Sequence, residues 1–256
     1  FDVEEFAKFQ GIMKDDETIN LIDPDNVQQI TMVDLDESGS MLADIEGYKI
    51  NEKNPNQVNR MTIAFQYLSI FANRTYNYRI PSIQGLVSFN QKPTIRCPLS
   101  PLVPDFEDKG FNIIVDPRAR TKLWDSLIFC CDEIIKYRKD KNGNEKFKNA
   151  KSRILVISDG EDKHSKATVE EVVIKMIQNN IIVDSIIINT YQKEVEQLKI
   201  LCAVCHATGG ISYKIEEDKP TKEETLKVDY IPNGVKKGLG FFEKAALLKK
   251  AAGLLR

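Results

Sequence analysis

Residues 31–41, TMVDLDESGSM, decide the fold and support two incompatible interpretations. An apolar run from Ile30 to Leu35 ends here in small polar residues, a pattern typical of a buried strand that opens into a loop. Counted from Asp34, the letters give DxDxS, the pattern of a phosphohydrolase with an aspartate nucleophile. Counted from Asp36, they give DxSxS, a loop whose oxygen atoms can bind a metal ion. The stretch therefore predicts either an enzyme or a metal-binding loop that catalyses nothing.

Composition narrows the class of protein. The chain has 256 residues, of which 42% are hydrophobic and 29% charged, as expected for an ordinary globular protein with one large α/β domain and appendages. The net charge of −2 gives no reason to expect nucleic acid as a partner. No apolar stretch approaches the ~20 residues that a membrane span needs.

The cysteines bear on the cellular compartment. There are five, at odd spacing and partly inside helical patterns, so we expect reduced thiols and a cytoplasmic protein. The chain begins at Phe1 rather than Met, which leaves an extracellular location open on the sequence alone.

Apolar, β-branched runs alternate with helical patterns along most of the chain. This alternation predicts an α/β fold: a doubly wound, Rossmann-like, mostly parallel six-stranded sheet with one antiparallel edge strand and helices on both faces. The strands are expected at 27–35, 83–89, 93–99, 153–158, 181–188 and 211–215, and the helices at 57–73, 121–139, 167–178 and 194–207.

Composition also divides the chain into four parts. We expect an N-terminal extension at 1–26, the domain at 27–216, a charged linker at 217–234 and a basic amphipathic helix at 235–256. The last helix is expected to dock on protein; contact with a membrane surface is the less favoured alternative.

The phosphohydrolase interpretation needs more than Asp34. An acidic pair is available in Asp159 and Asp162, at the end of an apolar run. Thr190, the hydroxyl residue that follows a buried strand, comes after this pair, which is the wrong order, and no lysine follows a strand end between them. Residues 42–56 are too few for the cap domain that such enzymes insert after the first strand. This interpretation is therefore the weaker one.

The metal-loop interpretation finds every residue that it needs. Asp36, Ser38 and Ser40 lie on the first loop, Thr121 begins a helix after a second loop, and Asp159 ends a later strand. The carboxyl ends of the strands converge at the switch point of a doubly wound sheet, so we expect these segments to meet there. Hydroxyl and carboxylate oxygens are hard donors that suit Mg²⁺ or Mn²⁺.

Several segments together resemble a known family. The stretches VDLDESGSM (33–41), RTKLWDSL (120–127), SDGED (158–162) and TGGISYKI (208–215), with the hairpin at 86–100, are similar to the von Willebrand factor A (VWA) domain with its metal-ion-dependent adhesion site (MIDAS). The resemblance covers roughly residues 27–216.

The resemblance implies a function and a ligand set. Ser38, Ser40 and Thr121 would ligate Mg²⁺ or Mn²⁺ directly, and Asp36 and Asp159 directly or through water. A protein partner would fill the open position with a Glu or Asp, which makes the domain a metal-dependent protein–protein interaction module and no enzyme. A VWA scaffold that binds its partner without a metal is the other expectation.

Four acidic residues near this set are less clearly assigned. Asp34 departs from the family pattern, which has an apolar residue there, and on a strand it points the same way as Asp36. We expect it to be protonated, paired with a basic residue or part of a wider metal shell. Glu37, Glu161 and Asp162 either surround the site or are solvated loop charges, and the second alternative is favoured.

Overall fold

The computed structural model describes residues 26–49, 57–77, 80–101, 113, 115–188, 196–215 and 228–230. The expected N-terminal extension, most of the expected linker and the expected C-terminal helix lie outside these ranges, and so does Thr190.

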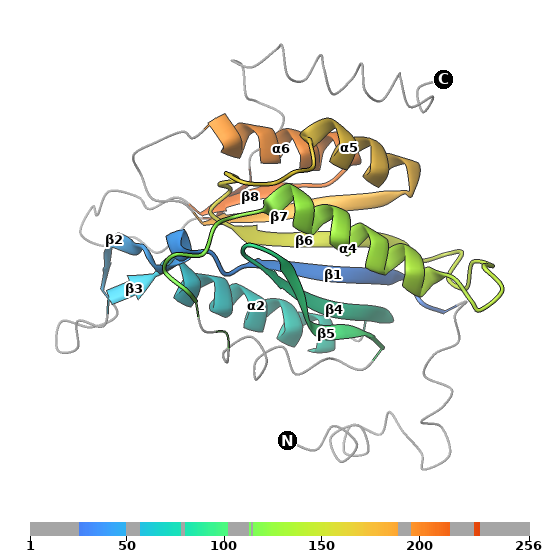
Figure 1. Ribbon diagram of the computed structural model, residues 1–256. Coiled ribbons are helices and arrows are strands. Elements are labelled where there is room, and N and C mark those ends of the chain that lie inside the picture. Colours follow the sequence, from blue (N-terminus) through green and yellow to red (C-terminus); the bar gives the residue numbers. More distant parts are fainter. Residues whose placement is uncertain are drawn as a thin grey trace.

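A mixed β-sheet forms the centre of the domain (Figure 1). The strands, in spatial order, are β5 (Pro93–Ser100), β4 (Ser82–Phe89), β1 (Gln29–Asp36), β6 (Lys151–Ser158), β7 (Ile181–Ile188), β8 (Ser212–Ile215) and β9 (Val228–Tyr230). β4, β1, β6, β7 and β8 run parallel, and β5 is antiparallel to β4. The six expected strands are therefore confirmed, and the antiparallel β9 is an addition within the segment expected to be a linker.

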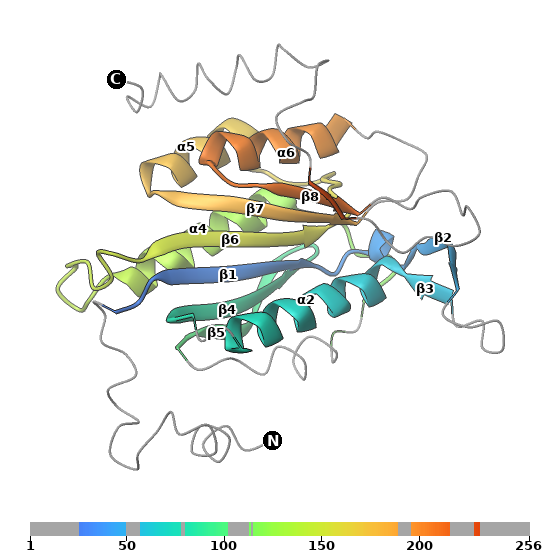
Figure 2. The same ribbon diagram turned by 180° about the vertical axis from the view of Figure 1, so that it is seen from behind.

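Helices cover both faces of the sheet, as expected. The described helices are α2 (Arg60–Asn77), α4 (Leu123–Arg138), α5 (Val169–Gln178) and α6 (Glu196–Thr208). Figures 1 and 2 show α2 and α4 on opposite faces. Two hydrophobic clusters match this arrangement, one shared by α4, α5 and α6 and one built on α2. Every residue of β1 after Gln29 is buried, because the strand has a helix layer on each side.

A small hairpin after β1 was not expected from the sequence. A 3₁₀ turn, η2 (Gly39–Leu42), leads to β2 (Asp44–Lys49), which pairs antiparallel with β3 (Gln57–Asn59). The helix expected from Gln57 begins instead at Arg60, because β3 takes the three residues before it. Asn59 caps the helix: its Oδ1 accepts a hydrogen bond from the Thr62 backbone N–H at 2.9 Å.

The strand order places a switch point at β1. From β1 the chain reaches β4 on one side, after α2, whereas β6 lies on the other side of β1 and follows α4 on the opposite face. Such a reversal opens a crevice at the carboxyl ends of the two central strands. Here those ends belong to β1 and β6.

Two further features of the described residues are plain. All five cysteines fall within the described ranges, and all are free thiols, as expected. None of the helices in these ranges has the length and apolar character needed to cross a bilayer.

Candidate metal centre

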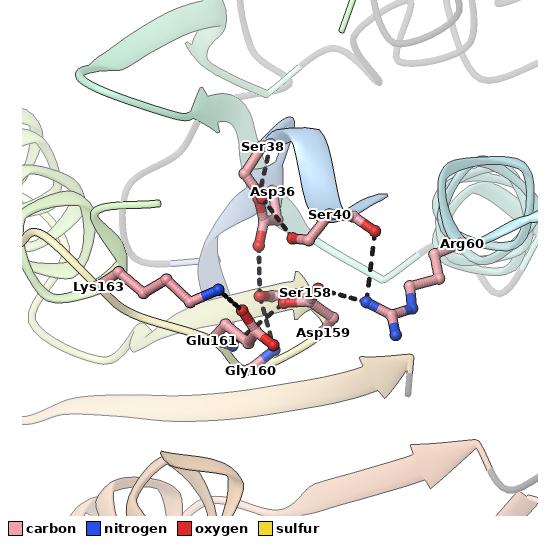
Figure 3. Close-up of polar contacts among 9 residues, drawn as sticks. All are labelled: Asp36, Ser38, Ser40, Arg60, Ser158, Asp159, Gly160, Glu161 and Lys163. Atoms are coloured by element: carbon pink, nitrogen blue, oxygen red, sulfur yellow. Dashed lines mark hydrogen bonds and ion pairs between the residues drawn. The ribbon is translucent and has the colours of Figure 1, made fainter. Parts of the chain in front are cut away.

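The first loop begins at the end of β1 and folds its polar side chains toward one another (Figure 3). Asp36 is fully buried, and its Oδ1 accepts a hydrogen bond from the Ser38 backbone N–H at 2.8 Å. The η2 turn brings Ser40 back so that its Oγ lies 3.0 Å from Oγ of Ser38. Three of the five predicted ligands are therefore adjacent in space as well as in sequence.

Gly39 is required by a close approach of a second loop. A Cβ added at Gly39 would lie 2.2 Å from the carbonyl oxygen of Pro117, which is backbone and cannot easily move aside. The Gly39 N–H donates to the Ala119 carbonyl oxygen at 3.3 Å. Glycine at this position thus lets the loop that carries Thr121 contact the loop that carries the two serines.

Asp159 follows β6, next to β1, and reaches the same place. The residue is 1% exposed. Its neighbour Ser158 donates a hydrogen bond from Oγ to Oδ2 of Asp36 at 2.6 Å, across 122 residues of chain. Oδ1 of Asp159 accepts from the Glu161 N–H at 3.1 Å. The ends of β1 and β6 are therefore linked directly, as the switch-point argument predicts.

Arg60 is a residue of the site that our sequence analysis missed. Its Nη1 donates to Oδ2 of Asp159 at 2.6 Å and to the Ser40 carbonyl oxygen at 3.3 Å (Figure 3). The arginine begins α2, 99 residues before its carboxylate partner. The nearest sequence signal is Asn59, which marks the start of a helix beside the site but does not indicate which carboxylate its first residue contacts.

Thr121 lies on the loop before α4 and is 5% exposed. Its carbonyl oxygen accepts from the Lys163 N–H at 3.4 Å, which joins its loop to the segment after Asp159. The structure thus brings the backbone of the threonine loop against both other loops. Ser38, Ser40, Asp36 and Asp159 are the predicted ligands whose side-chain contacts define the site (Figure 3).

Capping of α4 falls to residues from another loop. Oδ1 of Asp162 accepts from the Leu123 N–H at 2.8 Å, and Oγ of Ser165 accepts from the Trp124 N–H at 3.0 Å. The Asp125 N–H also donates to Ser165, at 3.2 Å. Asp162 is therefore a helix cap for α4, a role that the expectation of a solvated charge did not include.

Burial changes the acidity of Asp36. Its pKa rises from 3.8 to about 7, first because burial penalises the charged form and then because the charge of Asp159 repels a second negative charge. Hydrogen bonds from Ser158 and Ser38 oppose this rise. A cation near the two carboxylates would offset their repulsion and favour the ionised form of Asp36, so the electrostatics of the site favour a positive charge.

Asp34 lies on β1, two residues before Asp36, and its side chain contacts α4. Its Oδ1 accepts a hydrogen bond from Oγ of Ser126 at 2.7 Å, and its Oδ2 has no hydrogen-bond partner among the described residues. Burial raises its pKa to about 8; the Ser126 hydrogen bond lowers it and the Asp36 charge raises it further. Of the three states expected from the sequence, a protonated carboxyl fits these contacts best.

The remaining acidic residues have partners of their own. Glu37 is buried, and its carboxylate accepts from Arg96 Nη2 at 2.8 Å and from Asn90 Nδ2 at 3.0 Å. The expectation that Glu37 is a solvated charge is therefore wrong, because Asn90 in the β4–β5 turn and Arg96 of β5 bind its carboxylate. Glu161 forms an ion pair with Lys163 at 2.5 Å.

The donor set fits a hard divalent ion that relies on hydroxyl oxygens. Within the described ranges, no group of three or more His, Cys, Asp or Glu side chains is placed to hold a metal ion. Two buried carboxylates and two adjacent serine hydroxyls converge instead, and a guanidinium already neutralises one of the carboxylates. Oxygen donors of this kind suit Mg²⁺ or Mn²⁺ and not a thiolate-binding metal.

Comparison with solved structures supports the fold. The chain is similar to the VWA domain of SpRpn10, with a TM-score of 0.53, 18% identity and coverage of 76% of this chain and 91% of that one. It is also similar to BatB from Bacteroides thetaiotaomicron, with a TM-score of 0.52, 15% identity and coverage of 74% and 91%. At these identities the likeness concerns the fold alone, which is that of a VWA domain.

Comparison with known sequences says less about the protein than the comparison with solved structures. No protein-family model matches the chain. One curated relative, named as a probable bifunctional E2/E3 enzyme of Acanthamoeba polyphaga mimivirus, is 26% identical over 136 residues. The match takes in 53% of this chain but only 10% of that protein, so the chain spans about a tenth of the length of this relative.

Proposed function

We propose that this domain is a protein–protein interaction module that binds Mg²⁺ or Mn²⁺ and, through the ion, an acidic residue of a partner. Asp36, Ser38, Ser40, Thr121 and Asp159 are the proposed ligands. One observation carries the proposal: the Ser38 and Ser40 hydroxyls lie 3.0 Å apart beside the buried Asp36 carboxylate, which is hydrogen-bonded to Ser158, the last residue of β6 before Asp159.

The ligand chemistry explains why a partner would supply an acid. Two carboxylates balance the charge of a divalent ion, and neutral hydroxyls add none. Such an ion keeps affinity for a further negatively charged oxygen, and it prefers six oxygen ligands. A Glu or Asp side chain from another protein meets both conditions. The sequence resemblance to VWA domains with a metal-ion-dependent adhesion site implies the same role, and the VWA fold is compatible with it.

The phosphohydrolase alternative is disfavoured by the contacts of Asp34. A nucleophilic carboxylate must be ionised and must face the substrate. Asp34 is fully buried, bonds to Ser126 of α4, and has a pKa raised to about 8 by its burial. We therefore propose no catalytic role for this residue and no enzymatic activity for the domain.

A metal-independent scaffold is the second candidate, and Arg60 is the observation that favours it. An ion pair at 2.6 Å already neutralises Asp159, so the fold of the site does not depend on an ion. In this alternative the partner binds elsewhere on the domain and its affinity is the same in EDTA. The matched segment of the E2/E3 relative is a short part of that protein, and the match does not distinguish a metal-dependent module from a metal-independent one.

Calorimetric titration with Mg²⁺ and with Mn²⁺ tests the proposal. We expect saturable binding to the wild-type protein and none to the double variant Asp36→Ala with Asp159→Ala. Asp132→Ala, which removes an exposed aspartate of α4 outside the proposed ligand set, is the matched control and should bind as the wild type does. Absence of saturable binding in the wild type, or equal binding in the double variant, would contradict the proposal and leave the scaffold alternative.

A further inference from the structure

We propose that the Arg60 guanidinium is a built-in cation that competes with the divalent ion for Asp159, so that the ion binds only when this ion pair opens. The inference rests on the proposed function and names how the same site is regulated. It assigns to Arg60 a role that neither the fold nor the ligand motif requires.

The position of the guanidinium carries the inference. Nη1 contacts Oδ2 of Asp159 at 2.6 Å and the Ser40 carbonyl oxygen at 3.3 Å, so one nitrogen bridges the two loops that hold the proposed ligands (Figure 3). The side chains are 11% and 1% exposed for Arg60 and Asp159. The guanidinium therefore lies inside the site and not on its rim.

Charge makes the two cations alternatives to each other. Asp36 and Asp159 together carry two negative charges when ionised, which a divalent ion balances. With Arg60 also in place the buried site would hold an excess positive charge, and two cations that share one carboxylate repel strongly where water is scarce. We expect Arg60 to leave Asp159 when the ion enters.

The local structure indicates that α2 does not need this arginine. A positive charge in the first turn of a helix is opposed by the helix dipole, and the first turn of α2 has no acidic residue to offset it. Capping falls to Asn59, through its bond to the Thr62 N–H. The backbone N–H of Arg60 bonds to the Ala43 carbonyl oxygen at 3.1 Å, so the helix start stays anchored if the side chain moves.

Mn²⁺ titration followed by electron paramagnetic resonance of the free ion measures this competition directly. Arg60→Gln should bind Mn²⁺ about tenfold more tightly than the wild type, because the competing charge-assisted hydrogen bond is gone. The matched control is Arg74→Gln, which removes an exposed arginine from the last turn of the same helix and should bind as the wild type does. Arg60→Lys keeps the charge and should stay within about threefold of the wild type.

The outcomes separate this inference from the proposed function. Wild-type binding with equal or weaker binding in Arg60→Gln overturns the competition and leaves the metal site standing. Equal affinities in Arg60→Lys and Arg60→Gln overturn it too, because charge would then not matter. No Mn²⁺ binding in any variant overturns the proposed function together with the inference.

Thermal unfolding distinguishes the inference from a purely structural role, because a structural ion pair would not make the effect of Arg60→Gln on the midpoint depend on Mn²⁺. In EDTA, Arg60→Gln should unfold at a lower temperature than the wild type, because it leaves two buried carboxylates without their cation. Saturating Mn²⁺ should raise its midpoint by more than it raises that of the wild type. A deficit of the same size with and without the ion would identify a fixed structural ion pair and overturn the inference.

Discussion

Two aspartates of this protein form ion pairs with an arginine, and the two pairs are built differently. Oδ2 of Asp184, on β7, accepts a hydrogen bond from Nε of Arg153 on the neighbouring β6 at 2.7 Å and also lies 2.7 Å from Nη2 of the same guanidinium. Oδ1 of Asp184 accepts from the Ile211 N–H at 2.9 Å. Asp159 receives one guanidinium nitrogen, from Arg60 at the start of α2. The Asp184 pair is a two-point contact between adjacent strands, and the Asp159 pair is a single-point contact between distant segments.

The surroundings of the two pairs differ even more. Both oxygens of Asp184 are used by groups that the sheet itself fixes, so the pair contributes to the fold. Asp159 lies close enough to Asp36 for its charge to raise the pKa of that carboxyl. A carboxylate that repels its neighbour, and whose ion pair with Arg60 uses one guanidinium nitrogen, is suited to exchange that contact for another cation. The difference indicates that a cation-binding site can be recognised by buried carboxylates whose negative charges are only partly neutralised by neighbouring basic residues.

Asp184→Asn should cause the largest loss of stability. The change removes the charge that Arg153 neutralises within the sheet, and we expect a loss of about 2 kcal/mol, reduced from the cost of a fully buried pair because the Arg153 side chain is 26% exposed. Urea unfolding in EDTA measures the loss, and Mn²⁺ affinity should stay as in the wild type. A loss below about 0.5 kcal/mol would mean that this pair is not structural.

Asp34→Asn comes next: it should raise stability, by an amount that grows with pH. The folded protein keeps the Asp34 proton up to about pH 8, whereas the unfolded chain loses it near pH 4, so wild-type stability falls as pH rises between these values. The slope has a limit of about 1.4 kcal/mol per pH unit.

The Asn variant removes this part of the slope. In EDTA it should match the wild type at pH 5 and become steadily more stable than the wild type as the pH rises to about 8, as measured by urea unfolding. Equal slopes in the two proteins would show that Asp34 is ionised in the folded state.

Asp159→Asn should have the smallest effect on stability. The loss of the Arg60 ion pair is offset because the repulsion of Asp36 also disappears, and we expect a change of about 1 kcal/mol or less in EDTA. The same variant should lose Mn²⁺ binding by tenfold or more. If it were destabilised as strongly as Asp184→Asn, the contrast between the two pairs would fail.

Much of the fold could be predicted from sequence because it depends on local periodicity. The apolar run of β1 and the helical patterns of α4, α5 and α6 identify their elements within a few residues. The β2–β3 hairpin escaped prediction because neither short strand contains an uninterrupted apolar run, and β2 has Gly47 inside it. The three-residue β9 lies in a charged segment and carried no strand signal.

The residues of the candidate site also fall into those that the sequence could identify and those that it could not. Asp36, Ser38 and Ser40 could be identified because their spacing on one loop is itself the signal, and Asp159 because it ends a buried strand. Ser158, a donor to Asp36, looked like the last residue of a strand. Glu37 looked like a loop charge, yet Arg96 and Asn90 hold it against β4 and β5.

The sequence by itself determined which oxygen-bearing residues follow which strands, because strand and helix periods are properties of neighbouring residues. Only the tertiary structure decided which charges meet. Arg60 and Asp159 are 99 residues apart, and nothing local to either residue specifies the other. Their contact results from packing α2 on one face of the sheet so that its first residue reaches the carboxyl end of β6. Electrostatic energy depends on distance in space, and packing sets that distance.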